Sequence, residues 1–318
     1  MSICGLFLVG SVTLEGDTPD RQSGPSPDAG GPPRFPHGVC WWTVSWLGLI
    51  HAVALAAPFC FSWSGLWVML ALYWLTGGIG ICLGFHRLIS HRSFTTYRPV
   101  RWLIAWIGGL AGEGSAIQWA ATHRAHHALS DTAGDPHSPR RGFWWSHMLW
   151  CMARSTPAER TAMQQRWAPD LARDPVLRFL DRTFLHWHLL LAAVLGGIGL
   201  LFGGWYLACS LVVWGMAVRM VIVLHATWFI NSVTHVWGYR TYDAGDDSRN
   251  LWWVALVTFG EGWHNNHHAY QRCASYWHRW WEFDSTYLTI QLLRTLGVVW
   301  DVVPIPQDPK RKLASGRS

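Results

Sequence analysis

Four long apolar runs constrain this chain more than any other feature of its sequence. They cover approximately residues 41–62, 64–85, 184–202 and 206–230. About 20 apolar residues in a helix cross the hydrocarbon layer of a bilayer. Half of the 318 residues are hydrophobic and only 14% are charged, a composition that argues against a soluble fold. The runs therefore predict an all-α integral membrane protein with four transmembrane helices.

The placement of arginine orients these four spans. Many arginines lie between the second and third runs, whereas the two short turns within the pairs of runs carry no charge. The positive-inside bias then puts both termini and the long central segment in the cytoplasm. Two further apolar segments, 102–112 and 251–260, are too short to span, and we expect them to be interfacial or re-entrant.

The composition of the segments outside the apolar runs predicts where the domain begins and ends. We expect a disordered tail over 1–40, one membrane domain over 41–305 and a basic C-terminal tail over 306–318. Residues 1–13 are apolar but lack a basic start, so no targeting segment is predicted. The net charge of +6 comes with no nucleic-acid-binding motif, and the seven cysteines form no CxxC pair. We therefore expect neither a nucleic-acid partner nor a thiolate zinc site.

Nine of the seventeen histidines gather in four short segments, all on the predicted cytoplasmic side. These are HRLISH with His86 and His91, HRAHH with His123, His126 and His127, NSVTH with Asn231 and His235, and HNNHH with His264, His267 and His268. In a helix, residues i, i+3 and i+4 share a face, so each HxxHH segment presents its imidazoles together. HxxxxH shares no face in a straight helix, so His86 and His91 need a bend or frayed end to meet.

Nine imidazoles are too many for one ion and fit two ions with four or five ligands each. Imidazole suits several metals, but structural zinc usually uses cysteine, and hydrolytic zinc needs a carboxylate base as in HExxH, which is absent. Two histidine-rich ions beside an apolar interior fit oxygen activation by non-haem iron better. We interpret the other eight histidines as structural, with His147 the one to inspect: His37, His51, His137, His147, His186, His188, His225 and His278.

These motifs together resemble a known family. HRLISH, HRAHH and EGWHNNHH, with NSVTHVWGYRTYD before the last, resemble the three histidine boxes of membrane fatty-acyl desaturases of the Δ9, stearoyl-CoA desaturase-like type. The similarity covers roughly residues 80–285. It implies four transmembrane helices capped by a cytoplasmic helical domain with a dimetal site. It also implies that two Fe²⁺ ions, O₂ and two electrons from an external donor insert a cis double bond, at Δ9, into a long acyl chain.

The resemblance also implies a role for individual residues. One iron would be bound by His86, His91, His123, His127 and His267, and the other by His126, His235, His264 and His268, with Asn231 acting through a water. Asp131 and Glu261 are candidates to orient imidazoles from behind. Trp228 and Arg154 match substrate contacts in animal acyl-CoA desaturases. Arg140 and Arg141 are either further substrate contacts or interfacial anchors.

The sequence departs from the animal acyl-CoA enzymes at two places. Ala121-Thr122 stand where those enzymes have an Arg-Asp pair, and Ser155 stands where they have a lysine. The acyl carrier therefore stays open between CoA, acyl carrier protein and an intact lipid. The chain has no His-Pro-Gly-Gly haem motif, so we expect the electron donor to be a separate protein, either ferredoxin or cytochrome b5 with its reductase.

Two other functions compete with desaturation. A related di-iron membrane hydroxylase would act on similar substrates, but those enzymes tend to have HxxxH and HxxxHH boxes. A metal-binding or transport protein would need ionisable groups along its spans. The apolar runs contain only His51, His186, His188, Arg219 and His225, with no carboxylate.

Overall fold

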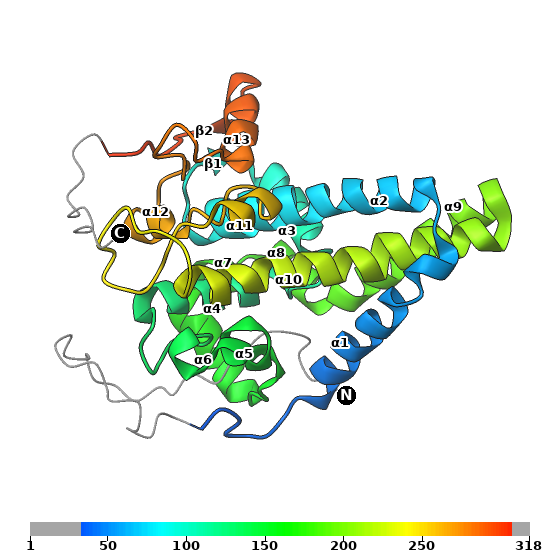
Figure 1. Cartoon of the computed structure of the whole chain (residues 1–318), viewed down its shortest axis with the longest axis horizontal. Helices are drawn as coiled ribbons and strands as arrows, with labels where there is room; N and C mark the ends of the chain where they lie inside the picture. The colour runs from blue at the N-terminus through cyan, green and yellow to red at the C-terminus, as the bar shows by residue number, and fades with distance from the viewer. Residues whose placement is uncertain (1–32, 307–318) are drawn as a thin grey trace.

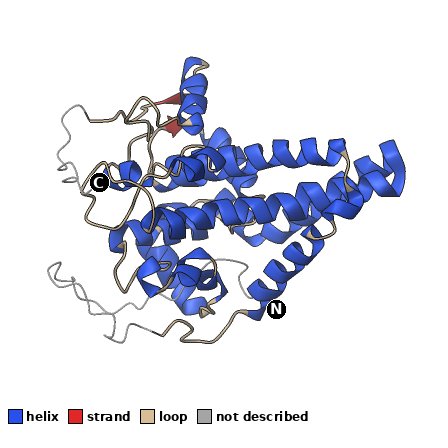
Figure 2. Ribbon diagram, viewed as in Figure 1, coloured by secondary structure: helices blue, strands red, loops and turns tan. Residues whose placement is uncertain are grey.

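The structure is a computed structural model that describes residues 33–306, and it is mostly helical (Figures 1 and 2). Most of the predicted N-terminal tail, with residues 1–13, and nearly all of the basic C-terminal tail lie outside the described residues. The last part of the N-terminal tail contacts the helices. The ring of Phe35 lies 5.6 Å from that of Trp145, and Val39 forms a β-bridge with Ala153.

Long apolar helices form one part of the molecule. In chain order they are α1 (Trp41–Ala54), the 3₁₀ turn η1 (Ala57–Cys60), α2 (Trp63–Tyr73), the π-helix η2 (Trp74–Ser90), α9 (Phe184–Val212), the π-helix η5 (Val213–Val218), α10 (Arg219–Ser232) and the 3₁₀ turn η6 (Val233–His235).

Shorter helices and one small sheet form the other part. They are β1 (Thr95–Thr96), α3 (Arg98–Gly109), α4 (Ala116–Leu129), η3 (Pro139–Arg141), α5 (Phe143–His147), η4 (Leu149–Met152), α6 (Pro157–Trp167), α7 (Pro169–Ala172), α8 (Pro175–Arg182), α11 (Trp252–Val257), α12 (His264–Ala269), α13 (Ser285–Thr295) and β2 (Val299–Trp300). Strands β1 and β2 pair antiparallel, with Thr95 opposite Trp300.

Two helical stretches within residues 33–306 are long and apolar enough to cross a membrane. Trp63–Ser90 has 28 residues and contains an 18-residue window with mean hydropathy 1.9, and Phe184–His235 has 52 residues and contains such a window with mean hydropathy 2.2. The longer stretch contains a chain reversal at Gly203 and Gly204, where Gly204 has φ +67°. Its two halves lie against each other. They are so close that a Cβ on Gly199 would be 2.3 Å from the Cα of Ala208.

The first predicted span differs from the other three. Its α-helix, α1, ends at Ala54, and only the short turn η1 follows before α2 begins. This segment is therefore not among the helical stretches of spanning length. The arrangement of four transmembrane helices stays a prediction.

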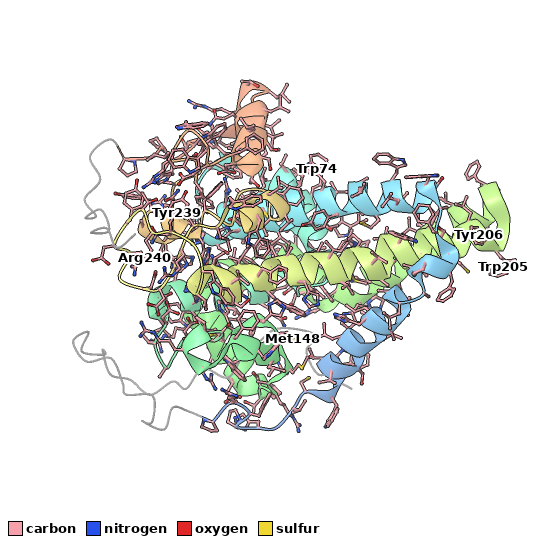
Figure 3. All side chains as sticks on the ribbon, in the orientation of Figure 1. Trp74, Met148, Trp205, Tyr206, Tyr239 and Arg240 are labelled. Atoms are coloured by element: carbon pink, nitrogen blue, oxygen red, sulfur yellow. The ribbon has the colours of Figure 1, made fainter. Side chains whose placement is uncertain are left out.

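The two uncharged turns of the apolar helices meet at one end of the molecule. The hydroxyl oxygens of Ser62 and Ser210 lie 2.7 Å apart, and the Tyr206 hydroxyl donates to the Phe61 carbonyl at 2.8 Å. Figure 3 places Trp205 and Tyr206 at this tip, far from Tyr239 and Arg240. Large exposed apolar side chains, including Leu201 and Phe202, cover the hairpin, as expected for a surface that faces lipid.

The π-helix η2 explains how the two histidines of the HxxxxH segment come to lie together. Its hydrogen bonds run from residue i+5 to residue i, so residues five apart lie one turn above each other. The amide of His91 donates to the carbonyl of His86 at 3.1 Å, and their rings lie 4.9 Å apart. The bend or frayed end expected from the sequence is supplied by a change of helix type.

Helix α3, formed by most of the short apolar segment 102–112, packs directly on η2. A Cβ on Gly80 would lie 2.6 Å from the Cα of Gly108, so the two backbones touch. Hydrophobic side chains between η2, α3 and α4 form one core, which includes Phe85 and Ile117. A second core, which includes Trp145, joins α1, α5, α9 and α10.

Candidate metal centre

Five histidines from η2, α4, α12 and the residue after η2 converge on one point. They are His86, His91, His123, His127 and His267, and a ligand nitrogen of each lies within 4.8 Å of the others. The Nε2 atoms of His91 and His123 are 2.7 Å apart, and those of His86 and His267 are 3.0 Å apart. We call this group the first cluster.

Four more histidines form a second cluster directly beside the first. They are His126, His235, His264 and His268, again within 4.8 Å of one another and all buried. The Nε2 atoms of His235 and His264 lie 3.1 Å apart. The buried Nε2 atoms of His126 and His268 have no hydrogen-bond partner among the described residues.

Each HxxHH segment divides its histidines between the two clusters. On α4, His123 and His127 join the first cluster and His126 joins the second. On α12, His267 joins the first cluster, while the two remaining box histidines join the second. The rings of His127 and His268, one from each cluster, are 4.5 Å apart. This grouping is the same as the one that the family resemblance implied.

Carboxylates stand behind four of the nine imidazoles. The Nδ1 atoms of His86, His126, His235 and His268 lie 2.6, 3.0, 3.1 and 2.7 Å from Glu261, Asp135, Asp131 and Asp246, respectively. A carboxylate accepts the Nδ1 proton and so leaves the Nε2 lone pair free to face the cluster. Asp131 and Glu261 were predicted for this role, and Asp135 and Asp246 were not.

The cluster geometry fits bound metal ions. Two ligand nitrogens at right angles, each about 2.1 Å from one ion, lie about 3.0 Å apart. The measured separations between Nε2 atoms, 2.7 to 3.1 Å, bracket that value. The unpartnered Nε2 atoms of His126 and His268 also point to an acceptor of their lone pairs, because buried polar atoms are normally satisfied.

The electrostatics of the clusters keep most of these imidazoles neutral. Burial, followed by repulsion between neighbouring histidines, lowers the pKa well below 6.5 for five of them: His91, His123, His127, His264 and His267. Burial also opposes the charge of His126, but the carboxylates of Asp135, Asp131 and Asp246 together outweigh it and raise the pKa of His126. Metal ions bind neutral imidazole, so the clusters have the protonation state that ligation needs.

The two asparagines of HNNHH fix the orientation of helix α12, which carries the three histidines of this segment. The side-chain oxygen of Asn265 accepts hydrogen bonds from the amides of Thr241 and Tyr242, both at 2.7 Å. Asn266 receives a hydrogen bond from the Asn250 side chain at 2.8 Å. Because α12 has only six residues, these bonds hold its far face to the loop that precedes α11, and its three histidines turn inward.

Arg87 anchors the first cluster from behind. Its guanidinium is fully buried and pairs with Glu261 at 3.0 Å and with Asp284 at 2.9 Å. Burial alone would raise the pKa of Glu261, but the charges and hydrogen bonds of Arg87 and His86 together outweigh it and lower this pKa. Arg87 was counted among the arginines that orient the spans, yet it is a buried structural cation.

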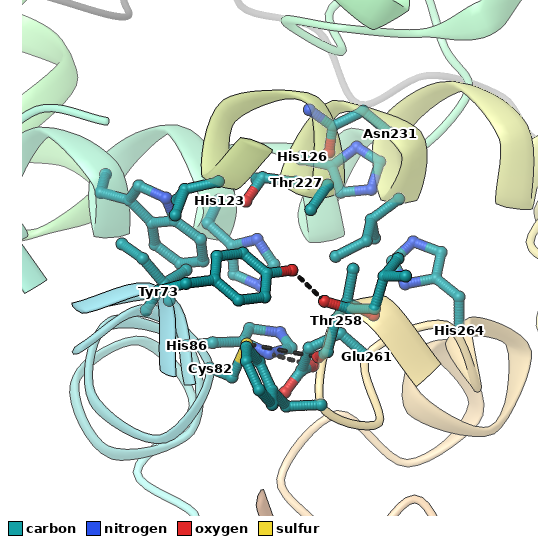
Figure 4. A pocket seen from close by; sticks show the side chains of 18 residues that line it. Tyr73, Cys82, His86, His123, His126, Thr227, Asn231, Thr258, Glu261 and His264 are labelled. Carbon is teal, nitrogen blue, oxygen red and sulfur yellow. Dashed lines mark hydrogen bonds and ion pairs between the residues drawn. The ribbon is translucent and has the colours of Figure 1, made fainter. Parts of the chain in front are cut away.

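An apolar cavity of about 580 Å³ reaches both clusters (Figure 4). Its inner wall contains His86 and His123 of the first cluster and His126 and His264 of the second, while Tyr73, Ile81, Val223 and Phe259 are among its apolar lining. The Tyr73 hydroxyl donates to the carbonyl of Val257 across this cavity. Asn231 also lines the cavity, beside His126 in Figure 4.

A smaller cavity of about 380 Å³ continues from the first. Asn231, Trp119 and Thr227 line both, and Trp228 lines the second. The buried carboxylate of Glu113 accepts hydrogen bonds from Thr227 at 2.6 Å and from Trp119 at 2.9 Å. Burial raises the pKa of Glu113 to about 7. No motif or spacing in the sequence pointed to this carboxylate.

The predicted arginine contacts lie elsewhere. Arg140 pairs with Asp247 at 2.8 Å, and the Arg141 guanidinium lies 4.0 Å from the centre of the Trp145 ring. Neither these two arginines nor the exposed Arg154 lines the cavities that reach the clusters. Their role in binding substrate stays a prediction.

Two of the histidines interpreted as structural have notable neighbours. His137 belongs to a buried group with His126 and Asp135 that could itself hold a metal ion. Nε2 of His147, the residue to inspect, lies 3.0 Å from Nδ1 of His225. Nε2 of His225 in turn lies 3.1 Å from Nε2 of His51. Among the described residues neither His147 nor His225 belongs to a metal-binding group.

Comparison with known proteins places this centre in a family. Residues 61–287 match the model of the family described as fatty acid desaturase. The chain is 50% identical to the sn-1 stearoyl-lipid 9-desaturase of Anabaena variabilis over 82% of this chain and 92% of that protein. It is 46% identical to the sn-2 palmitoyl-lipid 9-desaturase of Nostoc sp. over 88% and 95%, respectively.

A third relative has the same kind of name. The chain is 45% identical to the sn-1 stearoyl-lipid 9-desaturase of Synechocystis sp., over 84% of this chain and 81% of that protein. The match to the family model includes all nine clustered histidines. The chain therefore belongs to the fatty acid desaturase family and is a fatty-acyl desaturase.

Proposed function

We propose that this enzyme inserts a cis double bond at Δ9 of a long acyl chain esterified to a membrane glycerolipid. The observation that carries this proposal is the apolar cavity whose inner wall contains histidines of both clusters. One acyl CH₂–CH₂ unit, O₂, two electrons and two protons give one CH=CH unit and two waters. The double bond forms where the chain passes the clusters.

The lining of the cavity supplies binding and positioning. Each buried methylene contributes about 0.8 kcal/mol, so an extended chain against Tyr73, Ile81, Val223 and Phe259 is held along its length without polar contacts. The same side chains exclude water from the reacting carbons. Trp228 in the second cavity and the neighbouring Asn231 remain candidate contacts for the more polar part of the substrate.

The two clusters would each hold one Fe²⁺ ion. His86, His91, His123, His127 and His267 would bind one ion, and His126, His235, His264 and His268 the other, with Asn231 positioned to act through a water. When bound, the iron pair supplies the activation of O₂ that removal of hydrogen from an alkyl chain requires. The carboxylates behind His86, His126, His235 and His268 would hold the Nε2 atoms of these four toward the ions.

Three observations support a lipid-bound substrate over acyl-CoA. The relatives named above are named for acyl chains at the sn-1 or sn-2 position of lipids. The Arg-Asp pair and the lysine of animal acyl-CoA enzymes are replaced by Ala121-Thr122 and Ser155. Arg154, the matching CoA contact, does not line the two cavities that reach the clusters.

The membrane arrangement is part of the proposal. Four spans would place both uncharged turns on one side and both termini, with the metal centre, on the cytoplasmic side. The two long apolar helical stretches and the contact between the turns support it. A separate cytoplasmic protein, such as ferredoxin or cytochrome b5 with its reductase, would supply the electrons.

Expression in a desaturase-deficient host tests the proposed function. We expect Δ9-monounsaturated chains to appear in glycerolipids, with the double bond located by mass spectrometry and the sn position by regiospecific lipase. His267→Ala should abolish them, whereas His37→Ala, at an exposed histidine outside both clusters, should not. A hydroxy acid with no alkene would show a hydroxylase instead. Metal uptake with unchanged lipids would show a transport protein.

A further inference from the structure

A second cleft approaches the first cluster from a different side. Two members of the first cluster, His91 and His127, form part of its wall. None of its lining residues lines the apolar cavity of Figure 4, in which we place the acyl chain. That cavity reaches the same cluster through His86 and His123. The first cluster is therefore accessible from two separate surfaces.

The mouth of this cleft is cationic. Arg92, Arg124 and Arg272 line it, and no acidic residue does. Asp170, just outside the cleft, pairs with both Arg92 and Arg124 at 2.7 Å. One carboxylate therefore partly neutralises two arginines. Arg272 is exposed and has no ion pair with any of the residues 33–306.

The three arginines differ in what else they do. Arg124 also donates to the carbonyls of Ser90, Ile89 and Trp167, so it holds the end of η2 in place. The Arg92 side chain is 63% exposed, and neither Arg92 nor Arg272 has a comparable set of backbone bonds. Arg272 has no ion pair within residues 33–306, and Arg92 has one, with Asp170, so both exposed side chains can meet a partner.

The proposed reaction requires such a surface. Each double bond needs two electrons from outside, and the acyl chain fills the first cavity while they arrive. A carrier that docks at the second cleft meets His91 and His127 without displacing substrate. A cluster of positive charge steers and orients an acidic partner.

We propose that this basic cleft is the docking site of an acidic one-electron carrier protein, which delivers electrons to the first cluster through His91 and His127. This inference rests on the proposed function, because an electron carrier is needed only if the two clusters hold iron that activates O₂. Two reduced carriers bind in turn for each double bond, and each gives up one electron and leaves oxidised.

Binding of a 2Fe–2S ferredoxin with an acidic surface tests the docking directly. The full-length protein in nanodiscs is compared with Arg272→Glu and Arg92→Gln by biolayer interferometry at low and at physiological salt. We expect Arg272→Glu to weaken the affinity about tenfold or more, Arg92→Gln to weaken it less, and salt to weaken the wild type. The matched control is Arg294→Glu on α13, which changes the same charge at an exposed position outside the cleft.

A second measurement separates docking from catalysis. We expect the ratio of ferredoxin-driven to dithionite-driven alkene formation to fall about tenfold in Arg272→Glu and to stay constant in Arg294→Glu. Unchanged ferredoxin affinity in both cleft variants, or equal loss in Arg294→Glu, would overturn the docking site. A loss of ferredoxin affinity in Arg272→Glu that appears only in nanodiscs containing anionic lipid would also overturn the docking site. Failure of the wild type to form alkene with any reductant would instead refute the proposed function.

Discussion

At the scale of single residues, the carboxylates behind the clusters decide which nitrogen four of the nine histidines present. A neutral imidazole has one donor and one acceptor nitrogen. Asp246 lies 2.7 Å from Nδ1 of His268, and the opposite Nε2 is buried and without a partner among the described residues. The lone pair therefore faces the second cluster before any ion arrives, which lowers the cost of assembling the site.

Asp246→Asn tests this role of the carboxylate. The amide keeps the size of the side chain but removes the negative charge that holds the Nδ1 proton of His268. We expect the metal affinity of the second cluster to fall about 10- to 100-fold, while the first cluster, which Asp246 does not contact, keeps its ion. Iron content and chelator competition, followed by Mössbauer spectroscopy, measure the two sites separately.

Asp243→Asn is the matched control on the same loop. Its carboxylate is 66% exposed and lies 3.7 Å from Arg240, away from both clusters. It should leave both metal affinities unchanged. Equal loss of metal in the two variants would mean that the loop as a whole, and not the bond to His268, matters.

Eight of the nine clustered histidines could be predicted because HxxHH and HxxxxH are local patterns, and His235 because it ends the fourth apolar run on the same side. Their supporting carboxylates could be predicted only in part. Asp131 and Glu261 stand within a few residues of a histidine box, which drew attention to them, but the histidines that they contact, His235 and His86, belong to other segments. Asp135 and Asp246 are 9 and 22 residues from the histidines that they hold. Those pairs exist only because loops fold back over α4 and α12, and no spacing in the sequence encodes that contact.

At the scale of elements, the packing of η2 on α3 sets the position of the first histidine box. Gly80→Ala would place a methyl group 2.6 Å from the Cα of Gly108, where backbone, not a flexible side chain, must move. Overpacking of this kind costs about 1–3 kcal/mol. We expect a lower thermal unfolding midpoint in detergent and reduced iron content, because η2 also carries His86.

Gly109→Ala, on α3 directly after Gly108, provides the comparison. A Cβ there meets no atom within 4 Å, so we expect unchanged or slightly higher stability, by about 0.4–1 kcal/mol. If both alanine variants unfold at the same temperature as the wild type, the contact between η2 and α3 is looser than its geometry indicates.

The helices themselves could be predicted from hydropathy, but the type of η2 could not. Trp74 to Ser90 is apolar almost throughout, so no periodicity distinguishes a π-helix from an α-helix. The only sign was the separation of His86 and His91 by five residues. The extent of α1 was also not predictable, since the apolar run 41–62 continues past the point where the helix ends at Ala54.

At the scale of the whole molecule, the buried histidines make the stability of the metal-free protein depend on pH. The five strongly lowered pKa values mean that the unfolded chain takes up protons below 6.5 while the folded clusters do not. Unfolding is therefore favoured as pH falls below 6.5. The raised pKa of His126 acts in the opposite sense, but it is one group against five.

We therefore expect the unfolding midpoint of the metal-free protein to fall between pH 8 and pH 5.5, with most of the loss below 6.5. Differential scanning fluorimetry in detergent measures it. His267→Gln removes one of the five groups and should flatten the curve, whereas His37→Gln, at an exposed site, should not. A midpoint that rises toward pH 5.5 would contradict the expected sign.

The meeting of the two uncharged turns predicts which side of the membrane each end of the molecule faces. Cysteines placed at Phe59 and Trp205, both highly exposed in these turns, should react with a membrane-impermeant maleimide on intact cells. A cysteine at Trp280, equally exposed but in the segment after the third histidine box, should react only after permeabilisation, because the arginine-rich side stays in the cytoplasm. The native exposed Cys209 is first replaced by serine, and Cys4 with it. Labelling of all three from the same side would contradict the four-span arrangement, since a hairpin of helices that fails to cross leaves its turn and its base in one compartment.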